Sequence, residues 1–225
     1  MQTREKILPL ENGDRLTREE FERRYDAMPH LKKAELIEGV VYMGSPVRVT
    51  HGAPHARVMA WLGGYWTATP GVQVADNTTV RLDDDNEPQP DALLRIERGG
   101  QSTISEDGYI EGAPELIVEI AASSASYDLR DKLRVYRRNR VREYLVWQVY
   151  DRRFDWFQWR EGEYVGLEPD SEGAIRSGAF PGLWLSVAAL LEGDLVEVRR
   201  VWERGLATDE RDNFVRRLQN PRLDE

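Results

Sequence analysis

The chain has 225 residues, of which 40% are hydrophobic, 9% aromatic and 32% charged, so it is large and apolar enough for one folded domain and excludes general disorder. It contains no cysteine, which excludes disulfides, thiol catalysis and cysteine-ligated zinc. With 31 Lys and Arg against 40 Asp and Glu, the net charge of -9 excludes a protein that coats nucleic acid nonspecifically.

The N-terminal third predicts a helix, a hairpin and a second helix. Thr17 and Glu20 form a reciprocal capping pattern that begins a short helix over residues 16–27. Apolar pairs on both sides of Glu38 and Gly39 predict two strands within residues 34–43. Residues 54–69 place apolar side chains at helical spacing after a proline suited to a first turn. Two adjacent glycines, at 63 and 64, weaken this second helix.

Strands dominate from residue 71 onward. The β-branched segment 72–82 predicts a strand, and a polar turn leads to a short strand at residues 91–96. After a turn-rich loop, the apolar run 115–122 is typical of a central strand that is covered on both faces. A serine-rich start at residues 123–128 then caps a helix with apolar positions at 129, 133 and 136.

The remaining segments predict a hairpin and a helical tail. Residues 142–151 and 154–164 form the hairpin, which turns near residues 151–153. The tail contains two short amphipathic stretches, at residues 186–191 and 209–218. The whole order predicts an α/β (α+β) fold in which a mixed sheet is flanked by helices, with an N-terminal hairpin and a C-terminal helical tail.

Glu119 is the most informative residue, because it interrupts the apolar run of the predicted central strand. A carboxylate in a doubly covered strand is costly unless it is paired, protonated or bound to a metal. The alternative interpretation is that Glu119 lies near the strand end and meets an arginine.

Asp91 is the natural partner for Glu119. It follows Pro90 at the entry to the preceding strand, and if the two strands are neighbours, both acids project from one end of the sheet. Two carboxylates suit Mg²⁺, which usually binds one or two of them together with waters and phosphate oxygens. Alone, however, an Asp beside a Pro is ordinary turn chemistry.

Lys132 supplies a cation on the following helix. It lies beside the apolar position Leu133, at the edge of the helix face turned toward the sheet, so its ammonium could reach the strand ends and stabilise developing negative charge. The alternative is a solvated lysine that pairs with Asp128 one turn away.

Three further groups of side chains have both a functional and a structural interpretation. The segment 130–142 carries seven cations and could contact phosphates, or it is the charged outer face of a helix. The aromatic residues of the late hairpin could stack on bases, but more often such a cluster is sheet core or a subunit interface. Two histidines could assist a phosphate or a metal, but beside a helix start they are usually structural. The aromatic residues are Trp147, Trp156, Phe157 and Trp159, and the histidines are His51 and His55.

The sequence resembles the Uma-type putative restriction endonuclease family within the PD-(D/E)XK nuclease superfamily. The resemblance rests on NEPQPDALLRI, on EGAPELIVEIAASSASYDLRDKLRVYRRNRVREYLVW, on AELIEGVVYMGSP and on FPGLWL. It covers roughly residues 15–190, which we take as the nuclease domain, and residues 191–225 form the C-terminal tail. The resemblance implies a restriction-endonuclease-like core and metal-dependent cleavage of nucleic acid.

The resemblance assigns roles to individual positions. Asp91 matches the acid of the Pro-Asp motif, Glu119 the second acid, and Lys132 a lysine placed on the following helix. Glu35 matches an additional acid of the early hairpin, with Glu38 as a neighbouring candidate. His55 matches a histidine that precedes the first core helix. The sequence departs from the superfamily pattern at position 121, where alanine replaces the expected lysine.

The leading hypothesis is a Mg²⁺-dependent endonuclease that hydrolyses DNA, with Mn²⁺ as a possible substitute. Asp91, Glu119 and the backbone carbonyl of Ile120 would hold the ion, and Lys132 would act on the attacking water or the transition state. The alternative is a non-catalytic binding or self-assembly domain that retains the nuclease fold. We expect a homodimer. We also expect a cytoplasmic protein, because no apolar run reaches the roughly 18 residues of a membrane span and the first ten residues lack a signal-peptide core.

Overall fold

The computed structural model describes residues 7–44, 46–122 and 127–220. Its centre is a six-stranded sheet that is mixed, as predicted, because β8 and β9 are parallel and the other neighbouring strands are antiparallel. The order of the strands across the sheet is β11 (Glu163–Gly166), β10 (Arg153–Arg160), β9 (Glu143–Gln148), β8 (Leu116–Ala121), β5 (Ala92–Ile96) and β3 (Val72–Asp76).

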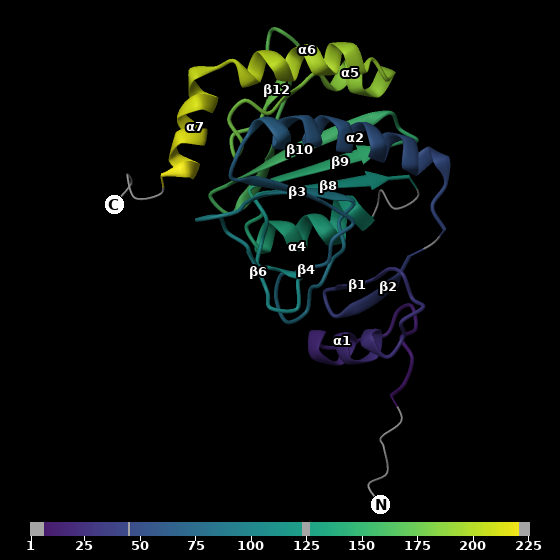
Figure 1. Ribbon diagram of the computed structural model, residues 1–225. Helices are drawn as coiled ribbons and strands as arrows, with labels where there is room; N and C mark the ends of the chain where they lie inside the picture. Colours follow the sequence, from purple (N-terminus) through teal and green to yellow (C-terminus); the bar gives the residue numbers. More distant parts are fainter. Residues whose placement is uncertain (1–6, 45, 123–126, 221–225) are drawn as a thin grey trace, which may run out of the picture.

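The strand β8 lies inside the sheet and is covered on both faces, which confirms the prediction for its apolar run. Side chains at even positions, such as Val118 and Ile120, pack with the helix α2 (Val49–Ala68). Ile117 and Ala121 point the other way and pack with the helix α4 (Leu133–Arg138). Figure 1 shows α2 and α4 on opposite faces of the sheet. Because strand side chains alternate, Glu119 points toward α4.

The helix α2 begins at Val49, one turn earlier than predicted, so Pro54 lies inside it. It also continues through both glycines that were expected to weaken it. At Gly64 the reason is close packing, since an added Cβ would lie 2.8 Å from the Trp202 ring of helix α6 (Leu195–Leu206). The absence of a side chain lets the two helices approach.

The single strand predicted over residues 72–82 is wrong, because the chain turns in its middle. Asn77 has a φ of 48°, a left-handed conformation that asparagine adopts more easily than most residues. Beyond it, β4 (Val80–Arg81) leaves the main sheet and joins β7 (Ile110–Glu111) and β6 (Thr103–Ile104) in a small second sheet.

Both predicted hairpins are present. The first joins β1 (Ala34–Ile37) to β2 (Val40–Met43), with Glu38 and Gly39 both left-handed at the turn, as a tight hairpin requires. The second joins β9 to β10, and the chain then turns again at residues 161–162 to form β11, which the sequence analysis did not separate from β10.

The C-terminal segments pack over α2. A two-stranded pair leads into two helices and a last helix; these elements are β12 (Ile175–Arg176), β13 (Trp184–Leu185), α5 (Val187–Glu192), α6 and α7 (Asp209–Gln219). The helix α6 was not predicted from the sequence. Val198 of α6 and Phe214 of α7 belong to the same apolar core as Trp61 of α2. The domain boundary at residue 190 stays a prediction. In the described ranges, no helix is both long and apolar enough to cross a membrane.

The helix α1 (Arg18–Asp26) confirms the first predicted helix, and Thr17 caps it by accepting a hydrogen bond from the backbone of Glu20. Together with β1 and β2 it forms an N-terminal unit whose small core includes Phe21 and Leu36. Leu36 and Glu87 exchange backbone hydrogen bonds, which attach this unit to the body of the chain.

Two carboxyl groups, one of them buried, lie at the same junction. Glu87 is 3% exposed, and Arg81 lies 2.9 Å from Glu22 of α1 and 4.0 Å from Glu87. Burial, the hydrogen bond with Glu22 and the charge of Glu22 raise the pKa of Glu87 to about 8, although Arg81 and Arg18 oppose the shift. This environment favours a protonated Glu87 beside Glu22.

We predict that this proton makes stability depend on pH. The folded-state pKa of Glu87 lies above the ordinary 4.5, so its contribution to stability is complete below about pH 4.5 and is lost as the pH rises through 8. The side chain of Glu87→Gln cannot ionise. The melting temperature of this variant minus that of the wild type should therefore increase from pH 6 to pH 9.5.

The control is Asp107→Asn, which removes another partner of Arg81. Its hydrogen bond with Ser105 and its contact with Arg81 hold the pKa of Asp107 below 3.8, so the charge of Asp107 is constant over this range. A Glu87→Gln profile parallel to that of the wild type would contradict the shared proton.

Candidate active site

Glu119 lies on the α4 side of β8 and is 3% exposed. Its Oε1 atom accepts hydrogen bonds from Lys132 Nζ and from the Tyr136 hydroxyl, each at 2.8 Å. The alternative interpretation expected an arginine as the partner of Glu119, but its partners are a lysine and a tyrosine. The carboxylate is buried and paired, as the cost of burying a charge requires.

Lys132 is buried, so the solvated alternative is wrong, whereas the predicted reach of its ammonium to the strand is confirmed by the contact with Glu119. It is 2% exposed, and its Nζ lies 2.8 Å from Glu119, 2.8 Å from Glu35 and 4.0 Å from Asp128. Residues Asp128–Lys132 form a π-helical turn, η1, before α4 begins. Asp128 and Lys132 are its buried residues, and Tyr136 of α4 continues the same face one turn later.

Asp91 immediately precedes β5, and β5 pairs with β8 so that Ala92 lies opposite Val118. Its Oδ2 atom accepts a hydrogen bond from the Ile120 backbone at 2.7 Å and lies 3.2 Å from the Nε2 of His51. Lys33 lies 3.8 Å from the other oxygen. The predicted pairing of these two strands is correct, and it fixes Asp91 directly to the peptide that follows Glu119.

The two candidate acids of the early hairpin have different positions. Glu35 of β1 is 8% exposed and reaches both Lys132 and the backbone N–H of Gln89 through Oε1 at 2.8 Å. Glu38 lies in the hairpin turn and pairs with Arg134 at 2.9 Å. Glu35 therefore belongs to the candidate site, whereas Glu38 forms an ion pair at the surface.

Both histidines of α2 contact the Asp91 segment. His51 contacts the carboxylate, and the Nε2 of His55 lies 2.9 Å from the Asp91 backbone oxygen and 2.9 Å from Asp76. His55 therefore holds the chain in place, which agrees with the structural interpretation. His51 is the histidine that touches the side chain of a candidate ligand.

The electrostatic environment separates the two acids. Burial disfavours ionisation of Asp91, but the His51 hydrogen bond, the Lys33 charge and the Ile120 N–H outweigh it and lower the pKa of Asp91 to about 2. For Glu119, burial and the charges of Asp91, Asp128 and Glu35 raise the pKa to about 8, although Lys132 opposes them. The local excess of carboxyl groups is what a bound cation would relieve.

The donor atoms fit a hard divalent cation. Within the described residues, hydrogen bonds to protein groups are carried by Oδ2 of Asp91 and Oε1 of Glu119. The other two oxygens have none, although Oδ1 of Asp91 lies 3.8 Å from the Lys33 ammonium, which a bound cation would have to displace or tolerate. The same ranges contain no group of three or more His, Asp or Glu side chains that could hold a metal. An ion would therefore complete its shell with a backbone carbonyl, waters and substrate oxygens, the arrangement Mg²⁺ prefers.

Three of the six arginines of segment 130–142 lie in surface ion pairs. Arg134 pairs with Asp131 at 2.7 Å, Arg137 pairs with Glu163, and Arg138 lies 3.3 Å from Asp83. Acidic partners thus offset much of the predicted basic patch, as expected for the charged outer face of a helix.

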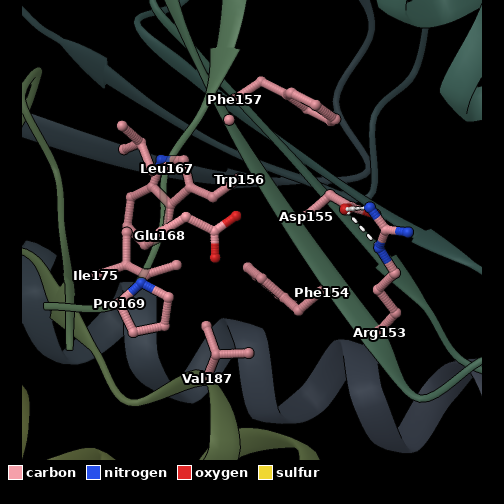
Figure 2. Close-up of a pocket in the computed structure, with 11 residues that line it drawn as sticks. Arg153, Phe154, Asp155, Trp156, Phe157, Leu167, Glu168, Pro169, Ile175 and Val187 are labelled. Atoms are coloured by element: carbon pink, nitrogen blue, oxygen red, sulfur yellow. Dashed lines mark hydrogen bonds and ion pairs between the residues drawn. The ribbon is translucent and has the colours of Figure 1, made fainter. Parts of the chain in front are cut away.

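The aromatic residues of the late hairpin are mainly sheet core. Trp147 and Trp156 are 3% and 1% exposed. A pocket of about 430 Å³ lies beside Trp156. Figure 2 shows Phe154, Trp156 and Leu167 among its lining residues, with the Arg153–Asp155 ion pair nearby. None of the residues that line the pocket belongs to the group formed by Asp91, Glu119, Glu35 and Lys132, so the pocket is separate from the candidate site.

Three site residues were not identified as such from the sequence. Tyr136 was read only as an apolar position, Lys33 had no assigned role, and Asp128 was read only as the surface partner of Lys132. A signal existed for two of them, because Asp128, Lys132 and Tyr136 are spaced by four residues and share one helix face.

We predict that removing the Lys132 ammonium strongly destabilises the fold. Lys132→Met leaves Glu35 and Glu119 buried without their cation, which should lower the free energy of unfolding by about 3–5 kcal/mol. Lys33→Met is the matched control, because its side chain is 30% exposed and its ion pair is long, so the loss should stay below about 1 kcal/mol. Urea unfolding in chelator measures both, and equal losses would contradict the central role of Lys132.

Comparisons with known proteins bear on the fold and the family of the chain. Among solved structures, the chain is similar to a putative nuclease belonging to DUF820 from Anabaena variabilis, with a TM-score of 0.60 and 15% identity. The alignment covers 76% of this chain and 96% of that one, and it shows a shared nuclease-like fold. No curated protein matches the chain. The sequence profile of the Uma2 family, described as "Putative restriction endonuclease", matches residues 18–188, and the chain therefore belongs to this family.

Proposed function

We propose that the protein is a Mg²⁺-dependent endonuclease that hydrolyses DNA phosphodiester bonds. The observation that carries the proposal is the pairing of β5 with β8, which bonds Asp91 to the peptide that follows Glu119 and leaves each acid one oxygen without a hydrogen bond to the described residues. Membership of a family described as restriction endonucleases supports the substrate class.

The residues divide the work between binding and chemistry. Asp91, Glu119 and the carbonyl of Ile120 would hold the ion, which supplies polarisation of the scissile phosphate and acidification of a bound water. Lys132 would orient the attacking water or neutralise the negative charge of the transition state. Lys132 would take the place of the lysine absent at Ala121, which lies two residues beyond Glu119 on the same face of β8.

Substrate would approach from the side of Lys33 and His51. Their side chains are 30% and 22% exposed, whereas those of Asp91, Glu119 and Lys132 are 7% or less exposed. A cation at the accessible side suits a phosphate oxygen. A homodimer that presents one site to each DNA strand stays a prediction, as do the cytoplasmic location and the use of Mn²⁺.

One observation favours the second candidate, a non-catalytic binding or assembly domain. Lys132 is held at 2.8 Å by two carboxylates, a geometry that a purely structural ion pair would also show. A general property of buried ion pairs argues against the non-catalytic candidate. Replacing both partners of such a pair by apolar residues often leaves a protein at least as stable, so stability alone is a weak reason for a chain to have one. The following predictions separate the two candidates.

We predict that Glu119→Gln abolishes cleavage of supercoiled plasmid in Mg²⁺ while the protein stays folded. The amide keeps an oxygen for Lys132 but replaces the second ligand oxygen by a donor, which cannot bind an ion. The control is Glu38→Gln, which removes a carboxylate from the turn outside the site and should cleave as the wild type does. Undiminished cleavage by Glu119→Gln would refute the assigned role.

We predict that Mg²⁺ stabilises the free protein. Above the dissociation constant, each tenfold rise in free Mg²⁺ should raise the free energy of unfolding by about 1.4 kcal/mol, because only the folded chain presents the site. Asp91→Asn should flatten this dependence. If millimolar Mg²⁺ leaves the wild-type melting temperature unchanged, the non-catalytic candidate is favoured.

A further inference from the structure

The hydroxyl of Tyr136 is the second donor to Glu119 and has no role in the mechanism above. It donates to Oε1 at 2.8 Å, and the Tyr136 side chain is fully buried between β8 and α4. Lys132 Nζ donates to the same oxygen at the same distance. Two donors therefore converge on one of the two carboxylate oxygens.

The helix places these donors with little freedom. Tyr136 lies one turn after Lys132, and the two side chains share the face of the η1 and α4 segment that meets the sheet. The ring of Tyr136 packs edge-on against that of Tyr144, with 4.8 Å between the ring centres. Packing thus fixes the ring, and the ring fixes the direction of the hydroxyl.

The consequence concerns which oxygen of Glu119 remains for an ion. A carboxylate turns readily about its terminal bond, so one donor leaves it some freedom. Two donors on Oε1 oppose that rotation, and Oε2 carries no hydrogen bond to the described residues. Groups that orient a metal ligand in this way commonly change metal affinity by 10–100-fold when they are removed.

We propose that Tyr136 is a positioning residue that locks Oε1 of Glu119 and thereby presents Oε2 to the divalent cation. The inference deepens the proposed function and rests on it. Tyr136 touches neither the ion nor the substrate and acts through Glu119.

Tyr144 offers a matched control within the same cluster. It is also fully buried, and its hydroxyl donates at 3.0 Å to the backbone oxygen of Asp128 and not to a ligand carboxylate. Tyr136→Phe and Tyr144→Phe thus delete the same atom from neighbouring rings. Phenylalanine keeps the ring packing, and Lys132 keeps Oε1 of Glu119 bonded, so we expect both variants to fold.

The test is isothermal titration of Mg²⁺ and Mn²⁺ into the full chain without DNA, with urea unfolding in chelator as the measure of stability. We expect Tyr136→Phe to weaken metal binding by 10-fold or more and Tyr144→Phe to change it by less than about twofold, with similar urea midpoints. In cleavage assays, Tyr136→Phe should need a higher Mg²⁺ concentration for half-maximal rate.

Three results would overturn the inference, and they are distinguishable. Wild-type affinity in Tyr136→Phe overturns the positioning role and leaves the proposed function standing. Equal losses of affinity in both variants point to general loosening of the core and also overturn it. If the wild type binds neither metal, both the proposed function and this inference fail.

Discussion

The ammonium of Lys132 is the interaction on which the candidate site depends. It joins three parts of the fold, since Glu119 comes from the central strand, Glu35 from the N-terminal unit and Lys132 itself from the helix beneath the sheet. Each contact buries a charge, so each is tolerable only while the others are present. The N-terminal unit is therefore tied to the body by the same ion pairs that shape the site.

This arrangement is a poor way to gain stability and a good way to prepare a cation site. Buried carboxyl groups outnumber the buried ammonium, and the raised pKa of Glu119 records the resulting electrostatic cost. Asp91 is treated differently, because an imidazole, an ammonium and a backbone N–H keep it ionised. The neighbours of Asp91 thus favour its ionised form, whereas Glu119 depends on the Lys132 ammonium to offset the cost of burying its charge.

Much of the fold followed from local patterns. The apolar run around Glu119 indicated a doubly covered strand. The position of Asp91 at the start of β5, the neighbouring strand, predicted that both acids lie at one end of the sheet. Features that depend on packing between distant segments did not follow. Gly64 of α2 is explained by Trp202, which lies 138 residues later in the sequence, and the split of residues 72–82 depends on one left-handed asparagine.

The same division holds for the site. Glu119, Asp91, Lys132 and Glu35 were identified from residue type and resemblance, but the depth of Lys132 was not. Two of the buried positions of this helix are the charged residues Asp128 and Lys132, so the apolar pattern pointed to Leu129 and Leu133, which are only partly buried. The ion pairs of the basic segment could not be predicted from the local pattern either, because Asp83 and Glu163 are distant from this segment in the sequence. Local pattern indicates which groups are chemically capable, and packing decides where they point.

The central claim is that Asp91 and Glu119 hold one divalent cation between them. Anomalous diffraction from crystals soaked in Mn²⁺ tests it most directly, because it locates the ion without reference to activity. The account predicts a single strong peak coordinated by Oδ1 of Asp91 and Oε2 of Glu119, with Lys132 still on Oε1. Crystals that show no peak there, with the two acids remaining bonded only to lysine, tyrosine and histidine, would contradict it.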